Sequence, residues 1–426
     1  MMLRSKIFCV FYLLLVFTFS LMVNKVQGQT YHFEKFTSKD GLIQSNARAI
    51  VQDRHGYLWI GTDGGLSQFD GKKFTSYSTN NGLKQPSVQT LCLDQKGNLW
   101  FGHTTGNLGY YDGKKFHYPV TDSLLLKHRI FHLFCDKSGN IWVSTIGAGV
   151  FMINPKRPRQ VKRFSEKENL CDEVFKTMQT KDGMIWFVTR IGIKQLNPKT
   201  QEINFYKPKG LPFFNYTSML EDYEGNLWFG SEANGLIKYS QRNNTCQNYE
   251  LKNGQVSGFV VDLMLASDSS IWAASWAEGN QSGGLIRIKG NELRFLSKQN
   301  GLPGEKAISV FEDQERNIWS GLFNSGLCKF KGFVFSHFGK EQGLKNTIVN
   351  SVLKEKTNLW VGTDNGIFIY KQTNTEGYQL IKEINTYEDL GSNQITSIVS
   401  TEGKIVVATF KGKIGFYDAE NYFLID

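Results

Sequence analysis

The sequence predicts an all-β protein built as a β-propeller of four-stranded blades. Three observations lead to this fold class: one motif recurs nine times, its period is 41 to 47 residues, and each copy reads as four short strands separated by turns. A fixed period of this size indicates a supersecondary unit that buries its apolar face only against its neighbours. Four strands in about 40 to 45 residues are typical of a propeller blade.

A tryptophan marks eight of the nine copies. A large flat side chain on an inner strand fits the space between wedge-shaped sheets, and truncating such a residue typically costs about 3 to 5 kcal/mol. We therefore interpret the repeated tryptophans as core residues. The repeated positions are Trp59, Trp100, Trp142, Trp186, Trp228, Trp272, Trp319 and Trp360, with Val406 in the ninth place.

Turn signals set the strand boundaries within each copy. Asp53 and Gly56 stand six and three residues before Trp59, and this Asp-x-x-Gly spacing recurs in other copies. Asp bonds to its own backbone locally and Gly accepts positive φ, so the motif predicts a turn between two strands. In the first copy we expect strands near 46–53, 58–62, 66–69 and 74–78. The spacing lacks the 3.6-residue apolar period of helical repeats.

The N-terminus predicts export. Arg4 and Lys6 precede an apolar run over residues 7–23, and small residues before Gln29 fit a cleavage site. These features are typical of a secretory signal peptide, predicted over residues 1–28. An uncleaved membrane anchor is the alternative. Beyond Gln29 the sequence has no apolar stretch of about 20 residues, so the mature chain is expected to be exported and periplasmic.

Composition and charge exclude several classes of function. The formal charge of +10 falls to +7 without Arg4, Lys6 and Lys25, and the remaining excess is spread through turn residues. Nucleic acid is therefore not an expected partner, whereas a mild preference for acidic ligands, such as uronic or sulfated sugars, stays open. The cysteines show no CxxC spacing, and no metal-ligand or phosphate-binding motif occurs, so we expect no cofactor and no metal.

The repeat resembles the two-component-regulator propeller repeat. The resemblance is carried by DRHGYLWIGTDGGLSQFDG at residues 53–71 and by KNTIVNSV and NLWVGTDNGIFIY at residues 345–352 and 358–370. It implies the periplasmic sensor region of a hybrid two-component histidine kinase, which recognises glycan-derived oligosaccharides. It also implies seven-bladed propellers in tandem, followed by sensor and kinase domains, or a partner histidine kinase. No kinase segment is recognisable here, so this chain is not expected to be an enzyme, and homodimer formation stays open.

The blade count predicts more than one ring. We expect a seven-bladed propeller over residues 29–331, closed by an outer strand at Phe33 to Phe36, and two further blades over residues 332–426 that begin an incomplete second propeller. This expectation follows from the similarity of the segments that begin at Tyr31 and Phe333. A single ring of eight or nine blades is the alternative.

Ligand contacts are expected around the mouth of the central channel, where side chains differ from blade to blade. Trp276 is the strongest candidate, because it is off the anchor column and offers an aromatic face to a sugar ring. It could instead pack against the loop of the next blade, and Arg190 could pair with Glu232. The candidate ligand-binding residues are Trp276, Arg190, Glu232, His103, Asn234, Arg129, Tyr216, Phe323 and Asn324.

A ligand sensor is the function that these features favour. A scaffold for protein–protein interaction would use the same face and is the first alternative. A propeller lyase or hydrolase is the second, with His103 and Glu232 as its acid and base. These two residues lie on non-adjacent blades and form a weak catalytic signal. No catalytic residue is therefore predicted.

Overall fold

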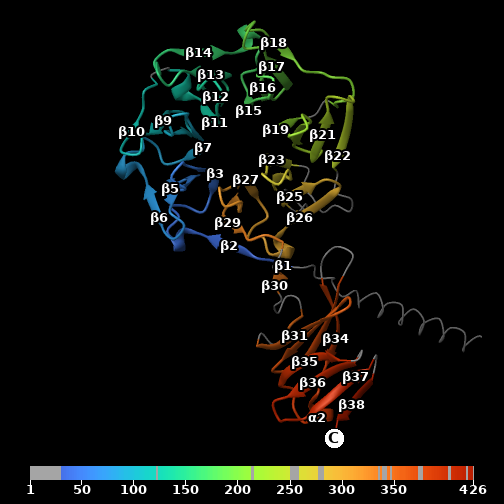
Figure 1. The fold of residues 1–426 in the computed structure, drawn as a ribbon. Helices are drawn as coiled ribbons and strands as arrows, with labels where there is room; N and C mark the ends of the chain where they lie inside the picture. Colours follow the sequence, from blue (N-terminus) through green and yellow to red (C-terminus); the bar gives the residue numbers. More distant parts are fainter. Residues whose placement is uncertain are drawn as a thin grey trace, which may run out of the picture. The chain divides into compact units, whose positions relative to one another are not determined.

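The structure is a computed structural model, and it confirms the all-β propeller fold (Figure 1). It describes residues 30–120, 123–212, 215–249, 259–276, 283–333, 336–337, 343–345, 348–372, 378–401, 404–418 and 421–425. The predicted signal peptide lies outside these residues. The chain divides into two compact units, Tyr31–Phe335 and a second one that includes Ser336–Asp426.

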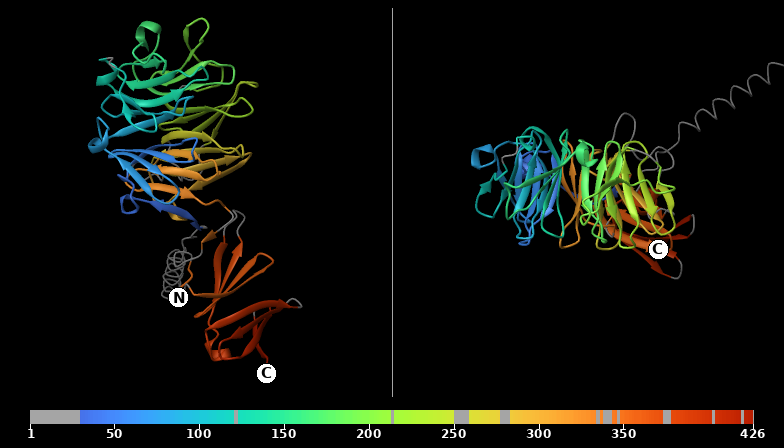
Figure 2. Two further views of the ribbon diagram at one scale, coloured as in Figure 1. Left: turned by 60° about the vertical axis from the view of Figure 1, so that its left-hand side comes forward. Right: turned by 90° about the horizontal axis from the view of Figure 1, so that it is seen from above.

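The first unit holds seven four-stranded antiparallel sheets among the described residues, arranged as the blades of a ring (Figure 1). Seen edge-on in Figure 2, the inner strands run along the axis of this ring. From the innermost strand outward, the first four blades are β3 (Ala47–Gln52), β4 (Leu58–Thr62), β5 (Gly65–Phe69) and β6 (Phe74–Tyr77); β7 (Val88–Leu93), β8 (Leu99–His103), β9 (Leu108–Tyr111) and β10 (Phe116–His117); β11 (Arg129–Cys135), β12 (Ile141–Ile146), β13 (Val150–Ile153) and β14 (Val161–Phe164); β15 (Val174–Gln179), β16 (Ile185–Thr189), β17 (Gly192–Leu196) and β18 (Ile203–Phe205).

The remaining three blades of the ring follow the same order. They are β19 (Tyr216–Glu221), β20 (Leu227–Ser231), β21 (Leu236–Ser240) and β22 (Thr245–Tyr249); β23 (Phe259–Leu265), β24 (Ile271–Trp276), β25 (Gly284–Lys289) and β26 (Glu292–Leu296); β27 (Ala307–Glu312), β28 (Ile318–Leu322), β29 (Gly326–Phe330) and β2 (Phe33–Phe36). The strand boundaries expected for the first blade agree with the observed ones to within one residue at every end.

The ring closes by mixing strands from the two ends of this unit. The N-terminal β2 pairs antiparallel with β29, so that Phe33 lies opposite Phe330 and Phe36 opposite Leu327. The segment Phe33 to Phe36 is therefore the outer strand of the seventh blade, as its sequence indicates. The inner strands β27 and β3 then pack side by side, and the backbone N–H of Gln314 donates to the side chain of Gln52 at 2.7 Å.

The conserved spacing of Asp and Trp within each copy has a direct structural cause. Every anchor tryptophan is buried, and the indole Nε1 of Trp100 donates to Oδ2 of Asp94 at 3.0 Å. The other carboxylate oxygen of Asp94 accepts the backbone N–H groups of the turn. One carboxylate thus accepts from a buried indole and caps a turn, so the indole N–H is not buried without an acceptor. The same indole-to-Asp bond occurs at Trp59, Trp142, Trp228 and Trp319.

Within the described residues, five short 3-10 helices lie on connections between blades: η1 (Ser38–Asp40), η2 (Thr79–Asn81), η3 (Leu125–Lys127), η4 (Glu166–Glu168) and η5 (Lys298–Asn300). Four of them begin with a capping box, for example between Thr37 and Asp40. A buried leucine follows, such as Leu42, and fixes the entry into the next inner strand. The four capped connections therefore hold the start of the inner strand that follows each of them.

The second unit contains two more four-stranded antiparallel sheets among its described residues. They are β31 (Val349–Glu355), β32 (Asn358–Thr363), β33 (Gly366–Gln372) and β34 (Tyr378–Ile384); and β35 (Ile395–Thr401), β36 (Lys404–Thr409), β37 (Ile414–Asp418) and β38 (Asn421–Ile425). A short helix, α2 (Tyr387–Leu390), connects them. The strands β1 (Thr30–Tyr31) and β30 (Ser336–His337) form a separate two-stranded sheet.

The first blade of the second unit pairs its two inner strands in a different register from the first blade of the ring. Trp360 lies opposite Leu353, seven residues before it, whereas Trp59 lies opposite Val51, eight residues before it. The turn between β31 and β32 is shorter, because Glu355 already pairs with Asn358. Val352, eight residues before Trp360, is therefore not opposite the tryptophan and is 58% exposed. That these two blades begin a second ring stays a prediction.

Candidate functional site: an axial cavity lined by bulged inner strands

All seven inner strands of the ring carry a β-bulge near their first residue. In the first blade, the pairing of β3 with β4 slips between Ala47 and Ala49. A bulge inserts one extra residue into a strand and redirects its side chain. The bulged residues are Arg48, Gln89, Phe131, Phe175, Thr217, Val261 and Ile308.

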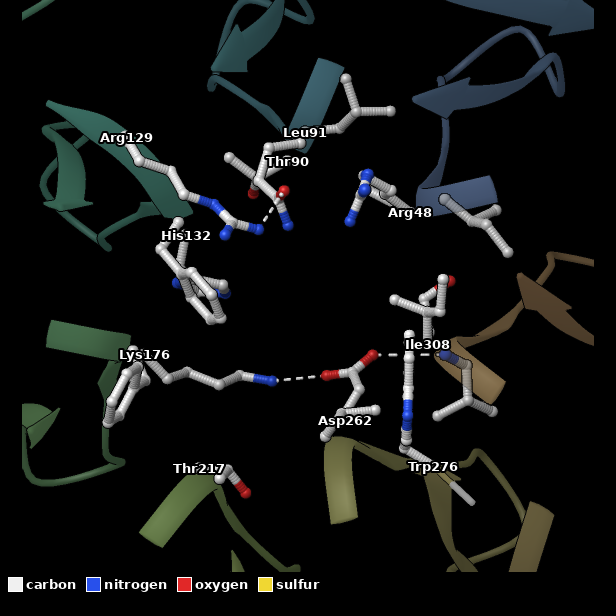
Figure 3. Close-up of a pocket in the computed structure, with 18 of the residues that line it drawn as sticks. Arg48, Thr90, Leu91, Arg129, His132, Lys176, Thr217, Asp262, Trp276 and Ile308 are labelled. Carbon is white, nitrogen blue, oxygen red and sulfur yellow. Dashed lines mark hydrogen bonds and ion pairs between the residues drawn. The ribbon is translucent and has the colours of Figure 1, made fainter. Parts of the chain in front are cut away.

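The bulged side chains meet in one cavity on the axis of the ring (Figure 3). Its volume is about 440 Å³, which lies within the range of small-molecule sites in proteins. All seven bulged residues line it, and several residues that follow a bulge complete the wall, including Thr90, His132 and Lys176. The fold thus provides one independently variable side chain per blade at a single site.

A charged pair crosses the cavity. Lys176 from the fourth blade donates from Nζ to Oδ1 of Asp262 on the sixth blade at 2.7 Å, as the dashed line in Figure 3 shows. The backbone N–H of Val310 donates to the second oxygen of Asp262 at 3.2 Å. Because both carboxylate oxygens of Asp262 accept hydrogen bonds, the ion pair forms a fixed part of the cavity wall.

Arg48 is held by a carboxylate outside the lining. Its Nη2 donates to Oδ2 of Asp63 at 2.9 Å, and its Nε donates to Oδ1 of the same residue. Partial burial acts to raise the pKa of Asp63, but hydrogen bonds from Arg48, Asn46 and Ser87 outweigh it and lower the pKa overall. Asp63 therefore stays ionised and neutralises Arg48.

Arg129 enters the cavity from the third blade without such a partner. Its Nη2 donates to the amide oxygen of Gln89 at 2.8 Å. Its Nε is buried and has no hydrogen-bond partner among the described residues. Burial first, and the nearby charge of Arg48 second, lower the pKa of Arg129 from its ordinary value. In Figure 3 the side chains of Arg129 and Arg48 reach into the same part of the cavity from opposite sides.

His132 lies in the wall as a neutral side chain. Burial, and after it the charge of Lys176, lower its pKa to about 3. The backbone N–H of Thr177 donates to His132 Nδ1 at 3.4 Å, which fits an unprotonated nitrogen at that position. Near neutral pH this ring therefore carries no charge.

Trp276 lines the cavity from the end of β24. Its ring lies 5.0 Å from that of Phe323 on the seventh blade, and Lys306 Nζ lies 4.9 Å from the centre of the indole. Trp276 thus packs against the neighbouring blade, which is one of the two roles that the sequence suggests for it. Its side chain also lines the cavity. Part of the loop that follows Trp276 lies outside the described residues.

Arg129 and Trp276 are the two sequence-predicted candidates that line the cavity. The others occupy different surroundings. His103 is fully buried, donates from Nδ1 to the carbonyl of Ser87 at 3.1 Å and lies near Tyr118 Oη. In five of the six other blades of the ring its position holds Ser or Thr, as at Thr62, whose hydroxyl caps the following turn, whereas the seventh blade has Leu322 there. His103 is therefore an internal structural group.

Arg190 and Glu232 do not pair with each other. Arg190 has a side chain that is 70% exposed and donates to Glu173 at 2.9 Å. Glu232 accepts instead from the side-chain amide of Asn215 at 3.1 Å. The separate pairs place both residues in the surface loops that follow their strands, away from the residues that line the cavity.

The last four candidates, Tyr216, Phe323, Asn234 and Asn324, do not line the cavity either, and Phe323 instead packs against Trp276. Tyr216 is buried and donates from its hydroxyl to the carbonyl of Pro212. The backbone N–H of Asn234 donates to Ser231 Oγ at 2.9 Å. Asn324 has a positive φ of 57°, and its backbone N–H donates to Asn46 Oδ1 at 2.6 Å. These residues shape the connections of the mouth.

Most residues of the cavity were not among the predicted candidates, although the sequence carries a signal for them. Each bulged residue stands exactly eleven positions before its anchor tryptophan, for example Arg48 before Trp59 and Phe175 before Trp186. The residues in this column differ in charge and size, although the column directly before it is mainly apolar, as at Ala47, Val88 and Ile130. A variable column inside a regular inner strand was the available indication of a binding site.

The seven blades and their shared cavity define a β-propeller with a ligand-sized site on its axis. The sequence profile described as "Two component regulator propeller" matches residues 41–64, 82–105 and 214–233. These three segments of the chain are therefore similar to the two-component regulator propeller repeat.

Similar proteins include sensor and enzyme propellers as well as a histidine kinase. The extracellular domain of a B. thetaiotaomicron protein described as a hybrid two component system superposes with a TM-score of 0.73 at 19% identity, covering 93% of this chain and 54% of that one. A histidine kinase of Formosa agariphila is 43% identical over 63 residues, which are 15% of this chain and 5% of that protein. Virginiamycin B lyase from Staphylococcus aureus has a TM-score of 0.57 at 13% identity, covering 71% of this chain and 99% of that one. The two solved structures share the fold, and this chain spans about half the length of the first.

Two further features of the described part of the chain concern metals and membranes. No group of three or more His, Cys, Asp or Glu side chains there is arranged to hold a metal ion. Within the same residues, no helix combines the length and the apolar character that a membrane span requires.

Proposed function

We propose that this chain is the ligand-sensing region of a two-component signalling system and binds a small, glycan-derived oligosaccharide in the axial cavity. The observation that carries the proposal is the convergence of seven bulged side chains on one cavity. The frame of the blades repeats, whereas the residues in this column differ, so the site can acquire specificity without any change in the fold.

The chemistry of the lining suits a sugar. Aromatic rings from Phe131, Phe175 and Trp276 offer apolar surface for the carbon-bound face of a sugar ring. Gln89, Thr90 and Thr217 offer groups that can donate to and accept from hydroxyls. A concave site that combines aromatic side chains with converging polar groups suits small-molecule recognition, which favours a sensor over a flat protein-interaction scaffold.

The same lining disfavours the catalytic alternative. A general acid or base near pH 7 needs a pKa close to that value. The pKa of His132 is lowered to about 3, and Asp262 is already paired with Lys176. His103, the histidine first considered as an acid, is buried outside the lining. The resemblance to a lyase therefore concerns the fold, and we propose no catalytic role.

The test is isothermal titration of the full chain with a panel of neutral and acidic oligosaccharides. Replacing Phe175 or Trp276 by Ala is expected to weaken binding at least tenfold, because each change removes apolar contact within the cavity. Tyr223→Ala is the matched control, since this aromatic residue is exposed on a turn between β19 and β20. Failure of the whole panel to bind, or equal affinity in all three variants and the wild type, would overturn the proposal. Product analysis of the same mixtures tests the enzyme alternative, because a lyase or hydrolase would shorten the ligand.

The proposal includes export and a signalling partner. Residues 1–28 serve as a cleaved signal peptide, so N-terminal sequencing of the protein from a periplasmic fraction should start at Gln29. An uncleaved Met1 in the membrane fraction would contradict this. A histidine kinase domain, in the same polypeptide or in a partner, receives the signal, and ligand-dependent kinase phosphorylation in membranes is the corresponding measurement.

A further inference from the structure

The charges that line the axial cavity do not balance. Four charged side chains line it: Arg48, Arg129, Lys176 and Asp262. Asp262 neutralises Lys176 at 2.7 Å, and Asp63 neutralises Arg48 from outside the lining. Among the described residues, no carboxylate oxygen lies within 4.0 Å of the Arg129 guanidinium, so the cavity keeps one uncompensated cation.

The surroundings of Arg129 make this imbalance costly in the empty site. A cation in a partly buried position needs an opposite charge or hydrogen-bond acceptors. Gln89 supplies one neutral acceptor, and the buried Nε has no acceptor. The nearby charges of Arg48 and Asp63 act on the pKa of Arg129 in opposite directions, because Arg48 lowers it and Asp63 raises it. A small rotation of the guanidinium toward a ligand would break no hydrogen bond of Nε. An oxyanion in this part of the cavity would supply both the missing negative charge and an acceptor for the Arg129 Nε.

We infer that the cavity contains an anionic subsite, in which Arg129 binds a carboxylate or sulfate group of the ligand between Gln89 and Arg48. Arginine suits this role because its planar guanidinium matches the oxygens of such groups. Trp276 lies on the opposite side of the cavity in Figure 3, where a sugar ring of the same ligand can pack. This inference rests on the proposed function and narrows the ligand class to acidic oligosaccharides, with uronic acid or sulfated units.

The experiment compares matched ligands with the full chain by isothermal titration. The probes are a neutral galactose trimer, the corresponding galacturonic acid trimer and a sulfated galactose trimer, each measured at low and at high salt. We expect the wild type to bind at least one acidic trimer at least tenfold more tightly than the neutral one, with an affinity that falls at high salt. The two acidic trimers distinguish a carboxylate from a sulfate.

Three variants assign the effect to Arg129. Arg129→Gln should remove the preference for the acidic trimer, whereas Arg129→Lys should retain part of it because the charge remains. Arg190→Met is the control, since this arginine is exposed and pairs with Glu173 outside the cavity. Thermal unfolding of each variant checks that the fold is intact. A neutral trimer that binds as tightly as both acidic ones, or an equal loss of all ligands in Arg129→Gln, would overturn the inference.

The failure of this inference can be separated from the failure of the proposed function. If neutral sugars bind and depend on Trp276 but the acidic group has no effect, the sensor proposal stands and the anionic subsite is wrong. If citrate binds in an Arg129-dependent manner while no sugar binds, the subsite stands and the glycan proposal is wrong. If no anionic compound binds, the inference is overturned.

Discussion

Lys176 Nζ lies 2.7 Å from Asp262 Oδ1, and this ion pair joins the fourth blade to the sixth across the channel of the ring. The two residues are 86 positions apart in the chain, and both follow a bulged residue of an inner strand. Because their side chains are only 15% and 25% exposed, water screens the pair less than it screens a surface pair. The ion pair therefore fixes one side of the cavity before any ligand arrives.

Asp262→Asn is expected to destabilise the ring by about 1 to 3 kcal/mol, because it leaves Lys176 in a partly buried position without its counter-charge. Chemical denaturation gives the change in the free energy of unfolding. Adding Lys176→Met should recover part of the loss, since it removes the isolated charge. Glu173→Gln, which breaks the exposed pair with Arg190, should have no measurable effect. A larger loss in the double variant than in Asp262→Asn would contradict a coupled pair.

Asp94→Ala is expected to cost about 2 to 4 kcal/mol, because it leaves the buried Trp100 indole and the turn amides without their acceptor. Asp94→Asn should cost less, since one side-chain oxygen remains. Thermal and urea unfolding measure both losses. Asp70→Ala is the control, because Asp70 caps only an exposed turn at Lys72 and Lys73. Similar losses for Asp94→Ala and Asp70→Ala would show that the bond to tryptophan contributes little.

The repeat and the closure of the ring could be predicted because each depends on residues that recur at fixed spacing. The wedge between blades must be filled in every copy, so Trp59 and its equivalents keep one position. The similarity between the segments at Tyr31 and Phe333 likewise indicates where an outer strand is needed. Packing constraints that repeat along the ring thus leave a visible column in the sequence.

The binding residues were harder to predict because a bulge breaks the two-residue alternation of a strand. Regular alternation does not tell that Thr217 and Phe131 face the same cavity. The prediction relied instead on the residues after the second strand of each blade, such as His103, where the structure shows a column of turn caps. Trp276 and Arg129 lie at strand ends that border the cavity, so the prediction of ligand contacts around the mouth of the channel included them.

The ring is expected to lose stability as the pH falls below about 6.5, because His103 stays neutral when folded. Burial lowers the pKa of His103 to about 4, although its bond to the Ser87 carbonyl acts in the opposite direction. As the pH falls through about 6.5, His103 takes up a proton in the unfolded chain but stays neutral in the folded protein. The stability that the neutral His103 contributes is therefore complete above that pH and decreases toward pH 4. At pH 5 the loss from this residue is about 2 kcal/mol.

His103→Thr tests this pH dependence with the residue that other blades carry at the same position. Thermal unfolding between pH 7 and pH 5 should show a smaller decrease for the variant than for the wild type. Part of the decrease in stability with falling pH should remain in the variant, because the pKa of His132 is also lowered, to about 3. An unchanged slope in the variant would mean that His103 does not remain neutral in the folded protein.

Gly321→Ala is expected to weaken the closure of the ring, because this glycine lies where the seventh blade meets the first. A Cβ at Gly321 would lie 2.2 Å from the backbone carbonyl oxygen of Ala47 on β3, so the strands would have to separate. Such overpacking typically costs about 1 to 3 kcal/mol. Gly230→Ala is the matched control in the same column, since its Cβ would meet the side chains of Ser218 and Val260. Limited proteolysis should then cleave the Gly321 variant faster near β2, whereas equal cleavage of both variants would show that this contact does not control closure.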